Sequence, residues 1–224
     1  MAKAVFDAWP GRYDKWFETR IGRLIKAYES DMLMTLLDPQ PGEIILDAGC
    51  GTGIFTRDVL ASGAGVIGMD LSRPMLTSAV EKLDRQRFCP VCADMCRLPF
   101  ADRSFDRVFS MTAIEFIKDA LPCIDELNRV TRKGGTIVVT TLNSLSPWAD
   151  RRKKKADKGH DLFEQIYFRS PDDLKQLMPN HAVIKTAIHF LKTDEISTAR
   201  LKEENGQKEQ SRTGAFLAVK WRKM

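Results

Sequence analysis

Three glycines follow a short apolar segment in a pattern that suits the binding of a small molecule. The segment reads Ile44-Ile-Leu-Asp-Ala-Gly-Cys-Gly-Thr-Gly-Ile-Phe55, which predicts a strand that runs into Gly49, Gly51 and Gly53 and then into a helix. Glycine lacks the Cβ atom that would keep a ligand away from the backbone, and the first N–H groups of a helix have no partner inside it. We therefore expect a ligand at the carboxyl end of this strand.

The spacing and one charge indicate which kind of ligand this is. A dinucleotide fingerprint reads G-x-G-x-x-G, but Ile54 occupies the place of its third glycine. Asp47 lies just before the first glycine, and its carboxylate would repel a pyrophosphate but attract a ligand with an ammonium and a sulfonium. The pattern therefore favours S-adenosylmethionine over NAD.

Three further segments match the pattern of one protein family, in the family's order. They cover residues 65–72, 93–106 and 129–140, and together with 45–53 they lie within about residues 40–143. In these motifs the chain resembles the class I S-adenosylmethionine-dependent methyltransferases, a broad group that includes the ubiquinone and menaquinone biosynthesis enzymes. The resemblance implies S-adenosylmethionine as cofactor, S-adenosylhomocysteine as its product, and a small-molecule methyl acceptor.

Strand and helix patterns alternate along the chain. We expect strands at 44–48, 65–70, 88–93, 106–111 and 135–142, and helices at 54–62, 73–84 and 119–131. This alternation predicts an α/β, Rossmann-like doubly wound sheet covered by helices on both faces. With two later strand-like runs, 182–192 and 214–222, the resemblance implies the strand order 3-2-1-4-5-7-6 with the last strand antiparallel.

The remaining segments are expected to complete a single domain over 1–224. Residues 1–38 combine an aromatic lead with helical spacing of apolar residues and predict an N-terminal helical cap. Residues 40–143 form the cofactor-binding core, and 144–224 the acceptor-side loop and closing strands. We expect 143–159 to be a polar, basic loop, and Ser170 to begin a short helix. In related enzymes such a cap folds over the cofactor; the alternative is a helix that only packs on the domain.

Three aspartates are predicted to meet at one crevice, because each follows the end of a strand. Asp70 is placed to accept hydrogen bonds from both ribose hydroxyls. By resemblance, Asp94 accepts from the adenine amino group, and Asp47 helps to hold the methionine ammonium. The alternative is that these side chains only cap loops or helices. The expected cofactor contacts are Tyr13, Asp47, Gly49, Cys50, Gly51, Thr52, Gly53, Asp70, Leu71, Met75, Asp94, Met95 and Ser110, with Leu71 and Met75 on the adenine face.

Glu115 is the titratable residue nearest to the expected entry of the acceptor, so it is a candidate general base; it could equally be a solvated or capping residue.

The segment from Ser110 to Phe116 lacks the Asp/Asn-Pro-Pro-aromatic motif of enzymes that methylate nucleic-acid amino groups. Cys123 follows a proline, as in cytosine carbon-5 methyltransferases, but it falls inside a predicted helix. Both observations argue against a nucleic-acid acceptor.

The five cysteines predict neither a metal site nor disulfides. Cys89, Cys92 and Cys96 imitate a zinc ligand set, but on a strand Cys89 and Cys92 would point to opposite faces. The number is odd and no export signal is recognisable, so we expect reduced thiols. The backbone of Cys50, rather than its thiol, is expected to serve the glycine loop.

The positive charge is concentrated in one segment. The net charge is +5, and residues 151–158 carry six positive charges and one negative charge, so the rest of the chain sums to zero. A solvated loop is the favoured interpretation, and attraction of an acidic acceptor is the alternative.

No apolar run is long enough for a membrane span, which favours a cytoplasmic protein. Two alternatives to small-molecule methylation stay open: a non-catalytic cofactor-binding module, and methylation of a nucleic acid or protein.

Overall fold

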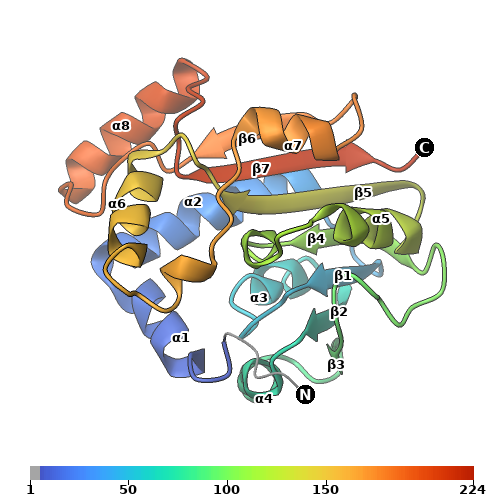
Figure 1. Ribbon diagram of the computed structural model, residues 1–224. Helices are drawn as coiled ribbons and strands as arrows, with labels where there is room; N and C mark the ends of the chain where they lie inside the picture. The colour runs from blue at the N-terminus through green and yellow to red at the C-terminus, as the bar shows by residue number, and fades with distance from the viewer. Residues whose placement is uncertain (1–5) are drawn as a thin grey trace.

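A seven-stranded sheet forms the centre of the computed structural model, which describes residues 6–224 (Figure 1). Its strands are β1 (Ile44–Ala48), β2 (Gly65–Asp70), β3 (Phe88–Cys92), β4 (Phe105–Ser110), β5 (Thr131–Leu142), β6 (Val183–Ala187) and β7 (Phe216–Arg222). The order is β3-β2-β1-β4-β5-β7-β6, and β7 is antiparallel to both of its neighbours. The expected Rossmann-like topology is confirmed.

Helices pack on both faces of this sheet. They are α1 (Pro10–Glu18), α2 (Arg20–Leu37), α3 (Thr56–Leu60), α4 (Arg73–Lys82), α5 (Leu121–Val130), α6 (Pro147–Ala156), α7 (Pro171–Leu177) and α8 (Ile196–Lys208), with short 3₁₀ turns η1 (Ile114–Phe116) and η2 (Phe163–Gln165). Within residues 6–224, no helix is long and apolar enough to cross a membrane.

The alternation of side chains along β1 divides the core in two. Ile45 points into the cluster shared with α2, α3 and α4, whereas Leu46 and Ala48 point into the cluster shared with α5 and α7. All three side chains are fully buried. A strand buried on both faces reads as a continuous apolar run, which is why β1 could be placed from sequence.

The prediction of a basic loop over 143–159 is wrong, because residues 147–156 form helix α6. The hydroxyl of Ser146 accepts a hydrogen bond from the Ala149 N–H at 3.1 Å, and Pro147 occupies the first helical turn, where its missing N–H is no loss. Trp148 and Ala149 are buried, whereas most of the basic residues are exposed. The cap from Ser146, the proline in the first turn and the burial of Trp148 and Ala149 all stabilise α6. Together they outweigh the repulsion between its neighbouring positive charges.

The strand-like run 182–192 is shorter than expected, because it pairs with β7 only over Val183–Ala187. Helix α8 was not predicted. The predicted helix at Ser170 is confirmed as α7. There the Ser170 hydroxyl and the Asp173 carboxylate form a reciprocal capping box.

The expectation that all cysteines are reduced is wrong for one pair, because the structure joins Cys96 and Cys123 in a disulfide. The loop after β3 brings Cys96 onto the face of the sheet that α5 covers, where Cys123 is buried. Cys50, Cys89 and Cys92 are free thiols. Among residues 6–224, no group of three or more His, Cys, Asp or Glu side chains could hold a metal ion.

Candidate active site

The glycine loop between β1 and α3 needs its glycines for two different reasons. Gly49, Gly51 and Gly53 have φ values of 82°, 53° and 78°, a region that strains other residues. A Cβ atom on Gly49 would lie 2.5 Å from the Ala113 Cβ, and one on Gly53 would lie 2.6 Å from Leu83. A Cβ on Gly51 would meet no atom within 4 Å. Gly49 and Gly53 therefore permit close packing, and Gly51 is the one of the three that borders open space.

The backbone N–H groups of this loop are partly engaged. Those of Gly49 and Cys50 both donate to the Met69 carbonyl, at 2.7 and 2.9 Å, and thereby fix the loop to β2. That of Gly51 donates to Asp70 Oδ2 at 2.8 Å. These three N–H groups are therefore engaged within the protein, and the contact of Gly49, Cys50 and Gly51 with the cofactor stays a prediction.

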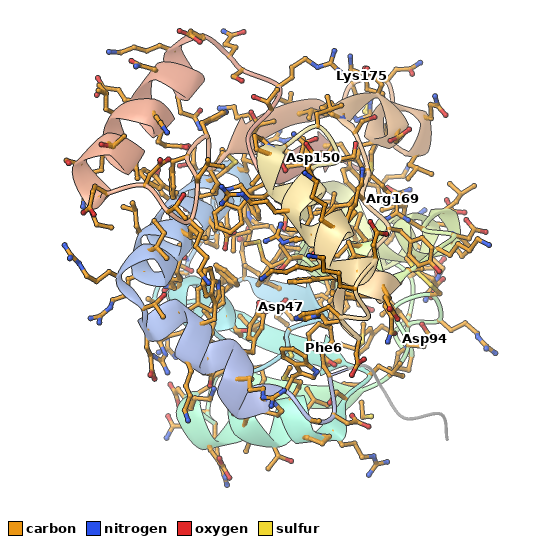
Figure 2. All side chains as sticks on the ribbon, turned by 60° about the vertical axis from the view of Figure 1, so that its left-hand side comes forward. Phe6, Asp47, Asp94, Asp150, Arg169 and Lys175 are labelled. Atoms are coloured by element: carbon orange, nitrogen blue, oxygen red, sulfur yellow. A yellow bond between two sulfur atoms is a disulfide. The ribbon has the colours of Figure 1, made fainter. Side chains whose placement is uncertain are left out.

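Asp47 carries a buried oxygen atom without a partner. Its side chain is in the middle of the molecule, and Oδ2 accepts a hydrogen bond from the Thr56 hydroxyl at 2.6 Å (Figure 2). Within the described part of the chain, Oδ1 has no hydrogen-bond partner. Burial raises the pKa of Asp47 to about 7, and the charge of Asp70 acts in the same direction. A buried polar atom left unsatisfied needs an explanation, and the ammonium of S-adenosylmethionine fits this oxygen.

Asp70 lies beside the same loop. Its Oδ1 accepts a hydrogen bond from the Ser72 N–H at 2.8 Å, which complements the bond from Gly51 to Oδ2. Burial raises the pKa of Asp70. The neighbouring Leu71 side chain is 60 % exposed although it is apolar, so an apolar surface borders this carboxylate. The structure thus brings Asp47 and Asp70 together at the carboxyl ends of β1 and β2.

Asp94 is in a different environment, at the edge of the molecule (Figure 2). Its Oδ1 accepts a hydrogen bond from the Cys96 N–H at 2.9 Å, so this side chain stabilises its own loop. Met95 and Met75 are both buried. Ser110 is buried as well, with its hydroxyl 3.9 Å from the Met95 sulfur. The loop-capping alternative therefore describes the present contacts of Asp94, and its adenine contact stays a prediction.

The N-terminal cap is attached directly to the glycine loop. The Thr52 hydroxyl donates to Asp14 Oδ1 at 2.6 Å, and Asp14 also forms a salt bridge with Lys82 of α4. The Ser72 hydroxyl donates to Asp7 at 2.8 Å. These bonds join α1 and the residues before it to the loop and to α4, and the closure of the cap over the cofactor stays a prediction.

A cavity of about 730 Å³ adjoins this site. Its walls come mainly from α1, α2, η1, α6 and η2, with Leu142 of β5 and Phe216 of β7. Of these elements, α1 and α6 both lie at the left of Figure 1. Most of its large apolar side chains are aromatic, namely Phe6, Trp9, Tyr13, Trp16, Phe17, Phe116, Trp148, Phe163 and Phe216. An aromatic lining of this size suits a small organic molecule.

Two buried glutamates lie in the cavity wall. Burial raises the pKa of Glu115 to about 7 and that of Glu29 to about 8. The Thr141 hydroxyl donates to Glu115 Oε2 at 3.2 Å. A carboxylate with a pKa near neutrality can both accept and release a proton, as a general base must. The structure thus places Glu115 in the wall of this cavity, and its role as a base stays a prediction. Glu29, in the same wall, was not identified from the sequence.

Tyr13 occupies the boundary between the cavity and the glycine loop. Burial raises the pKa of its phenol, which therefore stays protonated, and the side chain of Thr112 hydrogen-bonds to it. Thr112 has a φ of 46°, a strained conformation for a β-branched residue that is found mostly at functional sites. Thr112 was not predicted as a site residue. Residues 151–158 were expected near the acceptor only in the alternative to a solvated loop, and the helix that carries them into the cavity wall was not predicted, although Ser146 and Pro147 are a typical helix start.

Comparison with known proteins identifies the core of the chain. Residues 46–139 match a family model described as a methyltransferase domain. A malonyl-[acyl-carrier protein] O-methyltransferase of Pseudescherichia vulneris is 37 % identical over 134 residues, which cover 56 % of this chain and 53 % of that protein. A demethylmenaquinone methyltransferase of Beutenbergia cavernae is 38 % identical over 113 residues, covering 50 % and 46 %. The chain spans about half the length of these curated relatives.

Solved structures agree over the whole fold. A SAM-dependent methyltransferase from Thermotoga maritima superposes with a TM-score of 0.76 at 21 % identity, over 98 % of both chains. A methyltransferase from Haloferax volcanii, solved in complex with the Trm112 methyltransferase activator, gives 0.76 at 19 % identity, over 100 % of this chain and 99 % of that one. Residues 46–139 thus match the methyltransferase domain family, and the whole chain has the fold of the S-adenosylmethionine-dependent methyltransferases.

Proposed function

We propose that this protein transfers a methyl group from S-adenosylmethionine to a small molecule that binds in the aromatic cavity. The observation that carries the proposal is that the cavity adjoins the glycine loop. Tyr13 lines the cavity, and the next residue, Asp14, holds Thr52 of the loop. On the other side, Ala113 packs against Gly49 and lies between Thr112 and Glu115, two residues of the cavity wall.

The relatives support methyl transfer but do not favour one acceptor. Their names give malonyl-[acyl-carrier protein] in one case and demethylmenaquinone in the other. These two acceptors differ in chemistry, and this chain aligns with only about half of each relative. The substrate class must therefore be argued from the cavity of this chain.

The residues of the chain would chiefly hold and align the two reactants. When bound, S-adenosylmethionine supplies a methyl group activated by its sulfonium, and a neutral thioether is left after transfer. Asp47 would hold the ammonium through its free Oδ1, and Asp70 would hold the ribose hydroxyls. The cap would exclude water, because Asp14 fixes it over the loop.

Glu115 would act where the acceptor must lose a proton. An O–H or N–H acceptor forms a new bond to the methyl carbon, and its proton needs a base. The Glu115 carboxylate lines the cavity, and its pKa of about 7 lets it accept that proton near neutral pH. The Tyr13 phenol stays protonated and can only donate a hydrogen bond at such a pH.

Transfer of a labelled methyl group tests this function. The purified protein is incubated with methyl-labelled S-adenosylmethionine and a metabolite extract, and the small-molecule, protein and nucleic-acid fractions are analysed separately. We expect label in the small-molecule fraction, and its loss with the Asp70→Ala variant. Binding of S-adenosylhomocysteine without any labelled product would favour a non-catalytic module. Label confined to protein or nucleic acid would contradict the proposed acceptor class.

A further inference from the structure

The charged residues around the cavity are mostly cations. Six of its lining side chains are basic, namely Arg12, Arg151, Arg152, Lys154, Lys155 and Lys192, and only Glu29 and Glu115 are acidic. Within residues 6–224, none of the six cations lies within 4.0 Å of a carboxylate. Even with both glutamates ionised, the lining therefore carries a net charge of six minus two, or +4.

Arg152 is the cation set deepest in this wall. Its guanidinium carbon lies 5.3 Å from the centre of the Trp148 ring, and the Trp148 Nε1–H donates to the Phe190 carbonyl at 2.6 Å. The ring is thereby a fixed platform for the arginine. The Nη1 atom of Arg152 is buried and has no hydrogen-bond partner among the described residues. A buried guanidinium nitrogen without an acceptor indicates a ligand that supplies one.

His160 provides a second unused group in the same wall. Its ring stacks on Phe163, with centroids 4.0 Å apart and planes at 19°. Within the described part of the chain, His160 Nδ1 is buried without a partner. The Lys155 ammonium lies 5.8 Å from the centre of the same Phe163 ring. One part of the cavity wall therefore contains two cations, Arg152 and Lys155, and the ring nitrogen of His160, which has no partner among the described residues.

An amine would be the competing ligand, because aromatic rings and two glutamates can also bind an ammonium. The charge balance argues against it, since an amine would enter a wall of net charge +4 and approach the sulfonium of the bound cofactor. Burial also raises the pKa values of Glu29 and Glu115 to about 8 and 7, so their negative charge is incomplete at neutral pH. The glutamates are therefore weak partners for a cation.

We propose that the methyl acceptor is an anion with an apolar or aromatic body, whose carboxylate or phosphate is held by Arg152 with Lys155 and His160. This rests on the proposed methyltransferase function and adds the acceptor's class to it. The aromatic rings hold the body of the acceptor, and the anionic group fixes which end faces Glu115. The basic segment 151–158 then belongs to the acceptor site. This corresponds to the alternative given above, in which the segment attracts an acidic acceptor.

Binding of matched probes tests the proposal without knowledge of the natural acceptor. Naphthyl, biphenyl and octyl bodies are each prepared with a carboxylate, an alcohol or a primary amine, and their affinities are measured by calorimetry in the presence of S-adenosylhomocysteine. The parent is compared with Arg152→Gln and Arg152→Lys. Lys153→Gln is the matched control, because Lys153 is on the same helix but outside the cavity lining.

For at least one of the three apolar bodies, the parent protein should bind the carboxylate probe at least 10-fold more tightly than the alcohol probe and the amine probe. Arg152→Gln should weaken carboxylate binding by roughly 10- to 100-fold, as expected for a hydrogen bond to a charged group, and change alcohol binding by less than about 2-fold. Arg152→Lys should retain part of the preference, and Lys153→Gln all of it. Tighter binding of every amine, or no preference for the carboxylate with any body, overturns the proposal. If the parent fails to bind S-adenosylhomocysteine at all, the proposed function itself fails.

Discussion

Replacing Glu115 by glutamine should stabilise the folded protein, and more so at high pH. The folded state raises the pKa of this buried carboxyl from 4.5 to about 7, so folding disfavours its ionised form. Below the pKa that Glu115 has in the unfolded state, this carboxyl does not affect the free energy of unfolding. As the pH rises from that value towards the pKa in the folded state, the free energy of unfolding decreases. Glutamine has nearly the same shape but no charge, and it can still accept the hydrogen bond from Thr141.

The magnitude follows from the two pKa values. At about 1.4 kcal/mol per pKa unit, the loss of stability due to Glu115 is roughly 1 kcal/mol at pH 5 and about 3 kcal/mol at pH 8. The advantage of the Glu115→Gln variant over the parent should therefore grow by roughly 2 kcal/mol between these two pH values. Any constant difference in packing between the two side chains cancels in this comparison.

Urea unfolding at pH 5 and pH 8 measures this change. Glu81→Gln is a suitable control because Glu81 is exposed on α4, and its effect should be the same at both pH values. An equal effect of Glu115→Gln at pH 5 and pH 8 would refute the argument that burial raises the pKa of Glu115. The same variant should lose methyl transfer by roughly 10²- to 10⁴-fold if this carboxylate is the base.

Three other substitutions test the cofactor site and α6. Asp70→Ala should weaken binding of S-adenosylhomocysteine by roughly 10- to 100-fold in calorimetry without changing the circular dichroism spectrum, whereas Asp31→Ala, an exposed change on α2, should not affect binding. Asp14→Asn should increase the dissociation rate of S-adenosylhomocysteine in stopped-flow experiments, because the cap loses its salt bridge to α4; an unchanged rate would mean that the cap does not retain the cofactor. Ser146→Ala should lower the free energy of unfolding by about 1 kcal/mol through loss of the α6 N-cap, and no loss would show that α6 depends only on Trp148.

Local sequence patterns were sufficient to predict the part of the fold that we expect to hold the cofactor. The apolar run of β1 and the three glycines determine a strand and a tight loop over adjacent residues, and both are found where expected. The carboxyl ends of β1 and β2 then bring Asp47 and Asp70 together, since parallel neighbouring strands end at the same edge of a sheet. The strand order itself came from the family resemblance.

The acceptor side depended on contacts between distant residues. Helix α6 is anchored by Trp148, whose indole donates to the Phe190 carbonyl, and no local pattern reveals that bond. In α8, Glu203 lies within a charged stretch of the sequence, yet its side chain is buried and accepts hydrogen bonds from His189. Arg152 Nη1, which has no hydrogen-bond partner among the described residues, likewise takes its position from the packing of α6 against η2, which no local pattern reveals.

Calorimetric titration of the purified protein with S-adenosylmethionine, S-adenosylhomocysteine and NAD tests the central claim most directly. Asp47 Oδ1 has no hydrogen-bond partner among the described residues, and we expect its carboxylate to hold an ammonium and to repel a pyrophosphate. We predict one site per chain of micromolar or tighter affinity for S-adenosylmethionine or S-adenosylhomocysteine, and no heat of binding with NAD. Binding of NAD together with no signal from either adenosyl ligand would contradict the account.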